Sequence, residues 1–248
     1  MTAGLALETR GLTRKFSGFT AVDQVDFAVP QGELRAIIGP NGAGKTTFFR
    51  LLSGELRPSA GRIWFEGREV SGTAPHRLAR TGIGKSYQVT NGFPNLTVFE
   101  NVRIAAQPPG LDFRFWGSYR GQVRLAEKAG RILEIVNLQA KRDLLAGELS
   151  YGERRRLELG MALGTDPRLL LLDEPTAGMT PQETDSTIEL IHQIAAGRTV
   201  VLVEHKMKVV MTVSHRISVF HQGRILAEGS PEAIRANRDV QAVYFGAR

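Results

Sequence analysis

Short apolar runs of strand length alternate along the chain with segments whose apolar residues have helical spacing. Residues 1–35 hold alternating runs at Leu5–Glu8 and Val22–Val29, separated by glycine and proline, and this pattern predicts a β-rich start. Mainly apolar runs recur at Leu34–Ile38, Leu169–Asp173 and Thr199–Glu204. Strands that alternate with helices are typical of a parallel sheet, so the pattern predicts an α/β fold.

The middle of the chain, from about residue 88 to residue 165, is predicted to be helical. Thr97 and Glu100 match a capping box, in which a hydroxyl and a carboxylate bind the free amides of a helix start. Residues 107–117, rich in proline, glycine and aromatic side chains, interrupt the pattern, and helical spacing resumes over Gly121–Asn137. We expect this block to form a separate helical lobe.

These elements predict a single domain over residues 1–248, in which 1–87 and 166–248 form the core with a β lobe and 88–165 form the inserted helical lobe. The chain has no cysteine, which excludes thiol catalysis, thiolate metal sites and disulfides. No stretch approaches the ~18 apolar residues of a membrane-spanning helix, and the first residues lack a signal-peptide pattern. We therefore expect a soluble chain, which something else must hold in place if it works at a membrane.

The charge balance favours an anionic partner without choosing one. Lys and Arg number 32 against 25 Asp and Glu, which gives a formal net charge of +7. A nucleotide, a nucleic acid or an anionic membrane surface would each suit this excess.

A glycine-rich loop lies between the strand at 34–38 and a predicted helix at 44–53. Its sequence, Gly39-Pro-Asn-Gly-Ala-Gly44-Lys45-Thr46, matches the phosphate-loop pattern in the strand–loop–helix context which that pattern requires. Glycines let consecutive backbone amides turn toward one centre, which makes an anion site at a helix N-terminus. Lys45 would reach the β- and γ-phosphates, and the Thr46 hydroxyl would bind Mg²⁺. The expected nucleotide-binding residues of this loop are Gly39, Asn41, Gly42, Gly44, Lys45, Thr46 and Thr47.

A second stretch, Ala79-Arg-Thr-Gly-Ile-Gly84-Lys85-Ser86, satisfies a relaxed form of the same pattern. The residues before it are polar and helical rather than an apolar strand, and those after it do not favour a helix. We therefore exclude it as a phosphate loop.

Two acids and a histidine are expected at one edge of the sheet. Asp173 and Glu174 end the apolar strand at 169–173, and His205 follows the strand at 199–204. Ligands bind at the carboxyl ends of the strands in open α/β sheets. Asp173 would hold Mg²⁺, directly or through water, and Glu174, which faces the other way, would polarise the attacking water.

The start of the helix near residue 150 has two interpretations, which the residues alone leave open. Ser150 and Glu153 match a capping box, worth about 1 kcal/mol without any further function. The same hydroxyl and free amides also form an anion site.

Taken in chain order, these elements resemble the ATP-binding subunit of ATP-binding-cassette (ABC) transporters. The matching elements are the phosphate loop at 39–46, Gln88, Leu-Ser-x-Gly-Glu at 149–153, Leu-Asp-Glu-Pro at 172–175, and His205. They span nearly the whole chain, and the Leu-Ser-x-Gly-Glu signature is specific to this family among phosphate-loop proteins. The resemblance implies a phosphate-loop ATPase core, an N-terminal antiparallel β lobe and an inserted α-helical lobe, with ATP and Mg²⁺ as cofactors.

The resemblance also implies a role for each matching residue. Glu174 is implied as the catalytic base and His205 as the residue that senses the γ-phosphate. Gln88 is implied to touch Mg²⁺ and to relay the nucleotide state to a membrane partner. Phe16, which lies 23 positions before Gly39, is implied to stack on adenine. The implied metal ligands are Thr46, Gln88 and Asp173.

The signature residues are implied to act on a second subunit. Ser150, Gly152 and Glu153 would contact the γ-phosphate of ATP held by another copy, so the capping box and the anion site can coexist. Three departures from the common pattern bear on this coupling. Tyr151 stands in place of glycine, Met161 in place of arginine, and Ala177-Gly-Met-Thr180 in place of Ser-Ala-Leu-Asp.

Several stretches are similar to the branched-chain amino acid importers, and related systems for urea or short amides are closely similar. These stretches are residues 150–158, 177–184, 203–211 and 239–246, and the insertion at 107–120 is typical of the larger of the two ATPase subunits in such importers. The implied partners are membrane-spanning permease subunits, a second ABC ATPase subunit that is identical or different, and indirectly a periplasmic or extracellular substrate-binding protein. The implied location is peripheral, on the cytoplasmic face of the inner or plasma membrane, and no nucleic acid partner is expected.

Two alternatives stay open. The ATPase of lipopolysaccharide export systems shares the Gly-Glu-Arg-Arg-Arg continuation of the signature, although Tyr151 and the 107–120 insertion count against it. A soluble ABC ATPase that acts on nucleic acid would suit the +7 charge, but the chain has neither sustained heptads nor a second set of motifs.

Overall fold

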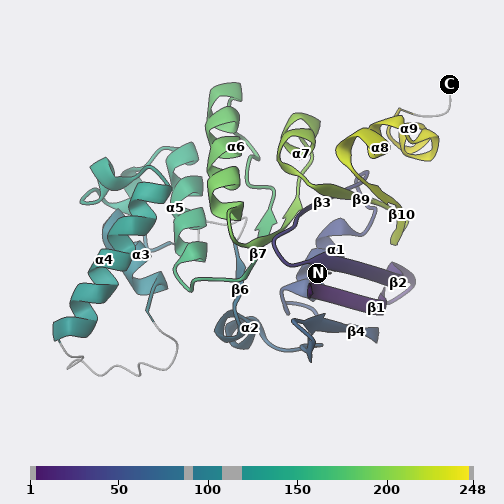
Figure 1. Ribbon diagram of the computed structural model, residues 1–248, viewed down its shortest axis with the longest axis horizontal. Helices are drawn as coiled ribbons and strands as arrows, with labels where there is room; N and C mark the ends of the chain where they lie inside the picture. The colour runs from purple at the N-terminus through teal and green to yellow at the C-terminus, as the bar shows by residue number, and fades with distance from the viewer. Residues whose placement is uncertain (1–3, 87–91, 108–118, 246–248) are drawn as a thin grey trace.

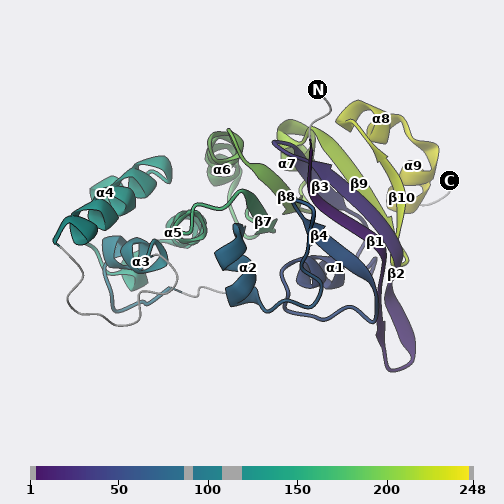
Figure 2. The ribbon, with the colours of Figure 1, turned by 60° about the horizontal axis from the view of Figure 1, so that its bottom comes forward.

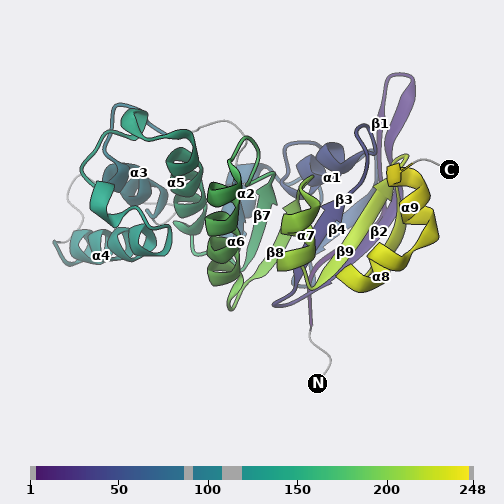
Figure 3. The same ribbon diagram turned by 90° about the horizontal axis from the view of Figure 1, so that it is seen from above.

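The computed structural model describes residues 4–86, 92–107 and 119–245. Figure 3 shows an elongated molecule. At one end lie three helices from the middle of the chain, α3 (Val98–Ala105), α4 (Tyr119–Ile135) and α5 (Tyr151–Leu163). The β1–β2 hairpin and the last two helices, α8 (Pro231–Ala236) and α9 (Arg238–Phe245), lie toward the other end. Within the described ranges, none of the helices combines the length and apolar character that a bilayer crossing demands.

Sheet A is antiparallel and comes from the start of the chain, as the predicted β lobe requires. Its strands, in the order β2-β1-β4-β5, are β2 (Phe19–Pro30), β1 (Leu5–Phe16), β4 (Ala60–Phe65) and β5 (Arg68–Glu69). β1 and β2 are each twelve residues long, much longer than the runs expected from the apolar pattern. Pairing continues through the polar, outward-facing positions because backbone hydrogen bonds do not depend on side-chain type.

Sheet B is the α/β sheet that the sequence predicted. Its strands, in the order β10-β9-β3-β8-β7-β6, are β10 (Arg224–Gly229), β9 (Arg216–His221), β3 (Leu34–Ile38), β8 (Thr199–Val203), β7 (Leu169–Asp173) and β6 (Ile83–Lys85). All neighbours pair in parallel except β9 and β10, which form an antiparallel hairpin. Strands β3, β7 and β8 are buried along their full length, which explains their continuous apolar character.

The second Gly-Lys-Ser stretch lies in a strand and not in a loop. Helix α2 (Pro75–Thr81) ends just before it, and Gly84 and Lys85 belong to β6, which pairs with β7. A strand presents its amides to a neighbouring strand and cannot converge them on an anion. The exclusion of this stretch as a phosphate loop is confirmed.

Helices cover both faces of sheet B, and alternate residues of one strand enter different cores. Leu169 and Leu171 of β7 pack with α1 (Lys45–Leu52) and sheet A, which Figure 2 shows beside that helix. Leu170 and Leu172 face the cluster built from α3, α4, α5 and α6 (Pro181–Ala195). Figure 1 shows α6 and α7 (Met207–Val213) on this second face. The period-two alternation of a strand therefore joins the helical lobe to the core.

Helix starts follow the predicted caps. The capping boxes at Thr97 and at Ser150 begin α3 and α5, and a third box at Thr180, followed by Pro181, begins α6. Two short 3₁₀ turns, Gln139–Lys141 and Ala146–Glu148, connect α4 to α5.

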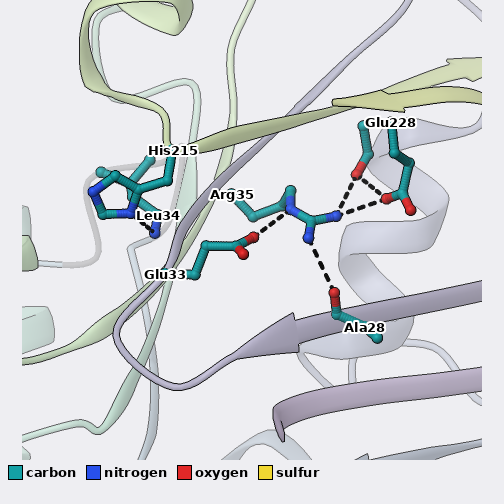
Figure 4. A network of polar contacts seen from close by, with 7 residues as sticks. Ala28, Glu33, Leu34, Arg35, His215 and Glu228 are labelled. Carbon is teal, nitrogen blue, oxygen red and sulfur yellow. Dashed lines mark hydrogen bonds and ion pairs between the residues drawn. The ribbon is translucent and has the colours of Figure 1, made fainter. Parts of the chain in front are cut away.

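A buried arginine ties the two sheets together (Figure 4). The Arg35 side chain, in β3, is only 2% exposed, and its guanidinium donates to Glu33 at 2.5 Å and to Glu228 of β10 at 2.7 Å. It also donates to Ser218 of β9 at 3.0 Å and to the Ala28 carbonyl of β2 at 3.1 Å. The buried charge is thus neutralised by two carboxylates and satisfied by strands of both sheets.

Arg35→Ala should lower the free energy of unfolding by about 3 kcal/mol, because it leaves two acids without their buried partner. Arg62→Ala is the control, since its ion pair with Glu69 is exposed on both sides and should contribute about 0.5 kcal/mol or less. Urea denaturation of both variants measures the difference. Equal losses would contradict the structural role of Arg35.

Candidate functional site

The phosphate loop occupies the turn between β3 and α1, where the sequence placed it. Gly44 has φ +99° and precedes the first helical residue, and a Cβ there would lie 2.3 Å from the Ala21 carbonyl oxygen. A Cβ on Gly39 would lie equally close, 2.3 Å, to the Phe220 carbonyl oxygen. Both positions need glycine because neighbouring backbone approaches the loop from β2 and from the end of β9.

Lys45 is the buried charge of the loop. Its ammonium donates to the Gly39 carbonyl at 2.7 Å and to the Pro40 carbonyl at 2.9 Å, so it lies inside the turn of the loop. Burial lowers the pKa of Lys45, and the negative charge of Glu174 opposes that shift. A cation held at the centre of a glycine-rich turn, at the start of a helix, is suited to bind phosphate.

Glu174 and His205 face each other across the ends of β7 and β8. The Glu174 carboxylate lies 3.0 Å from Nε2 of His205, and the Glu174 amide donates to the Val203 carbonyl at 2.8 Å. Glu174 adopts φ +46°, a left-handed conformation that is costly for a residue with a side chain. Strain of this kind persists where the surrounding structure enforces it, and it is common at functional sites.

One pocket, of about 460 Å³, brings the loop, the acid and the histidine together. Its volume lies within the range of small-molecule sites. It is lined by Phe19, Thr20, Ala21, Asn41, Gly42, Ala43, Gly44, Lys45, Thr46, Thr47, Glu174, His205, Gln222 and Gly223. Of the predicted nucleotide-binding residues, Gly39 and Phe16 are not among those that line it.

An aromatic residue that the sequence analysis missed lines this pocket. Phe19 is 61% exposed, and its ring stacks on that of Phe16 with centroids 5.5 Å apart. The two rings lie on either side of the β1–β2 turn at Gly18. The sequence could have indicated Phe19, because it lies three residues after Phe16 and a tight hairpin turn between them brings the two rings together. A planar base would therefore meet a pair of stacked rings.

Asp173 is buried at the end of β7, apart from the pocket lining. It is 6% exposed. Burial raises its pKa, the Lys85 ammonium opposes the rise, and Glu174 adds to it. The buried carboxylate of Asp173 and the hydroxyl of Thr46 are hard oxygen donors of the kind that Mg²⁺ prefers, with phosphate and water left to complete the shell. These residues fit the predicted metal.

The predicted signature residues lie on a different part of the molecule. Ser150 caps α5, its hydroxyl accepting from the Glu153 amide at 3.4 Å while the Glu153 carboxylate accepts from the Ser150 amide at 3.0 Å. The Lys141 ammonium, 2.6 Å from Glu153, is the main cause of the lowered pKa of that acid. Neither these two residues nor Gly152 lines the pocket of their own chain. Gln88 lies outside the described residues.

Two of the departures from the common pattern contact each other. The Tyr151 ring packs on Gly178, where a Cβ would lie 3.1 Å from the ring, and the Tyr151 hydroxyl accepts from Arg155 at 3.3 Å. Thr180 caps α6. Met161 is partly buried against the core of the helical lobe. The tyrosine of the signature is thus accommodated by the glycine of the loop that follows Glu174.

Family models and individual relatives both match this chain to the ATP-binding proteins of ABC transporters. The ABC transporter family model matches residues 22–177, and the model described as "Branched-chain amino acid ATP-binding cassette transporter" matches residues 224–248. The chain is 41% identical to the high-affinity branched-chain amino acid transport ATP-binding protein BraF of Pseudomonas aeruginosa, with 97% of each chain covered. It is 38% identical, again with 97% of each covered, to the corresponding protein LivG of Escherichia coli.

Solved structures agree with the fold. A nucleotide-free ATP-binding cassette from an ABC transporter superposes with a TM-score of 0.86 at 30% identity, covering 98% of this chain and 100% of the other. The ADP conformation of such a cassette gives the same TM-score and identity. The fold, the phosphate loop and the family matches lead to one conclusion: the chain belongs to the ABC transporter family, as an ATP-binding and ATP-hydrolysing cassette.

Proposed function

We propose that this cassette powers a membrane transporter that takes up branched-chain amino acids. The observation that carries the proposal is the similarity to branched-chain amino acid transport proteins, which covers 97% of the chain and includes a separate match at residues 224–248, beyond the part common to ABC transporters. Urea and short amides are the related cargoes to test against it. The division into a core and a helical lobe at about residues 88–165 is part of the same proposal.

The chemistry we propose is hydrolysis of ATP in the pocket between the phosphate loop and Glu174. The loop amides and Lys45 bind the phosphates, and the paired Phe16 and Phe19 rings receive the adenine. Glu174 accepts a proton from the attacking water. The oxygen of that water bonds to the γ-phosphorus, and the bond between the γ-phosphorus and the β–γ bridging oxygen breaks, so that ADP leaves. His205, 3.0 Å from that carboxylate, holds it in place and faces the γ-phosphate. Mg²⁺, held by Thr46, Asp173 and Gln88, would neutralise charge on the phosphate oxygens.

We further propose that two cassettes close on two ATP molecules, because each pocket lacks a signature of its own. Ser150, Gly152 and Glu153 sit at the start of α5, and none lines the pocket that holds Lys45 in the same chain. A helix N-terminus with a hydroxyl is suited to a terminal phosphate. ATP that binds the closed pair better than the open one would drive closure, and hydrolysis would reopen the pair.

Mixing two inactive variants tests this pairing. Lys45→Ala damages the pocket and Ser150→Arg damages the signature, so each variant alone should hydrolyse little ATP. In an equal mixture half of the pairs are mixed and each mixed pair has one intact site, so activity should recover to about a quarter of the wild-type rate. A mixture no more active than its components would contradict a shared site.

The partners follow from the same proposal. Membrane-spanning permease subunits would hold the cassette on the cytoplasmic face of the membrane, and a substrate-binding protein would deliver the cargo from the other side. Co-purification with a membrane partner tests this directly. Recovery with nucleic acid, or with lipopolysaccharide-export components, would replace it with one of the alternatives.

A further inference from the structure

A buried carboxylate that the proposed chemistry does not use accepts hydrogen bonds from both loops that carry Glu174 and His205. Glu204 follows β8 and is 2% exposed. Its Oε1 accepts hydrogen bonds from the Thr176 hydroxyl and from the Thr176 amide, the latter at 3.3 Å. Its Oε2 accepts from the amides of His205 at 2.6 Å and Lys206 at 3.3 Å. Burying an ionised carboxylate is costly unless it is fully bonded, and four donors meet this one.

These four donors come from two loops, one on each side of the site. Thr176 lies two residues after Glu174, on the loop that follows β7, while His205 and Lys206 follow β8. Lys206 adds a second link, because its ammonium donates to the Met179 carbonyl and to the Thr184 hydroxyl, each at 3.0 Å. Glu204 itself does not line the pocket. It therefore acts on the reacting groups only through the backbone that carries them.

The strained backbone of Glu174 explains why the hydrogen bonds of Glu204 matter for the site. A glutamate held at φ +46° before a proline relaxes unless its neighbours are fixed. The Glu174 amide bond to Val203 fixes one side of the residue, and the Thr176 bonds to Glu204 fix the other. The same carboxylate holds the His205 amide, so one side chain sets where both groups lie.

We propose that Glu204 is a positioning residue that fixes the Glu174 carboxylate against His205 and thereby sets the rate of ATP hydrolysis. The inference rests on the roles proposed above for Glu174 and His205. It requires a carboxylate, because Oε1 and Oε2 each accept from two donors. In Glu204→Gln the side chain has one acceptor oxygen and one N–H₂ donor. The N–H₂ group faces the donors of one of the two loops, so the hydrogen bonds to that loop are lost.

The test separates turnover from binding. Glu204→Gln and Glu204→Ala should each lower kcat by about tenfold or more, since small displacements of a reacting group have effects of this size. The ATP dissociation constant should change by no more than about twofold, because the phosphate loop is untouched. Thr176→Val, which removes the donor on the other side of the bond, should lower kcat as well. The double variant Glu204→Ala/Thr176→Val should be no slower than Glu204→Ala alone, because both substitutions break the same Glu204–Thr176 hydrogen bond.

Glu228→Gln is the matched control, since it alters a partly buried carboxylate of the Arg35 network that does not line the pocket. Its kcat per folded molecule should match the wild type. Glu204 variants that keep the wild-type kcat, or that lose activity only in proportion to the unfolded fraction seen by thermal denaturation, would overturn the inference. Glu174→Gln belongs in the same series. If it turns over normally, the proposed base is wrong; if it is inactive while the Glu204 variants are not, only the positioning role fails.

Discussion

Glu174→Gln should lower ATP turnover by about a thousandfold while leaving ATP binding intact. The amide keeps the shape of the side chain and its place beside His205, but it cannot accept a proton from water, and general-base catalysis contributes about 10² to 10⁴ in rate. Because the γ-phosphate is not removed, a pair of cassettes closed on ATP should accumulate. Single-turnover hydrolysis measures the rate, and size-exclusion chromatography with ATP measures the pairing.

Glu69→Gln is the control for this change, since it removes an exposed carboxylate of β5 that does not line the pocket. It should hydrolyse ATP at the wild-type rate. Turnover of Glu174→Gln within about threefold of the wild type would show that another group takes the proton, since the expected loss is far larger.

Lys45→Ala should raise the ATP dissociation constant by at least about thirtyfold. Removing one partner of a buried, hydrogen-bonded charge pair costs about 2 kcal/mol or more, which corresponds to that factor. The effect should be large here because the Lys45 ammonium is already inside the loop, 2.7 Å from the Gly39 carbonyl. Equilibrium binding of a fluorescent ATP analogue provides the measurement.

Lys208→Ala is its matched control, because that lysine is exposed and pairs with the surface acid Asp185. Its ATP affinity should not change. Unaltered affinity in Lys45→Ala would remove the phosphate-loop assignment and, with it, the basis for placing ATP in this pocket.

The elements that are determined by residues close together in the chain could be predicted from the sequence. The strands β3, β7 and β8 are buried on both faces, so their apolar runs are continuous, and the phosphate loop needs glycines at fixed positions. Ser150 and Thr180 cap their helices through residues three positions away. In each case the residues that determine the structure are neighbours in the chain.

Features that depend on distant residues escaped prediction. Strand β6 is three residues long with glycine at its centre, and it exists because Ile83 and Lys85 pair with β7. Helix α7 was not predicted because its seven residues mix lysine and methionine among buried valines. Glu204 is an ordinary acid at the end of a strand until Thr176, 28 residues away in the chain, is brought against it.

The function proposed for this cassette can be tested most directly by the response of its ATPase to transported solutes. The cassette, purified with its membrane partner and supplied with the cognate binding protein, would be assayed for ATP hydrolysis with leucine, urea or acetamide. The account predicts that leucine raises the rate and that the other two do not, with no rise in Glu174→Gln. Stimulation by urea or acetamide alone would reassign the cargo, and no response to any of the three would contradict the proposed transport of branched-chain amino acids.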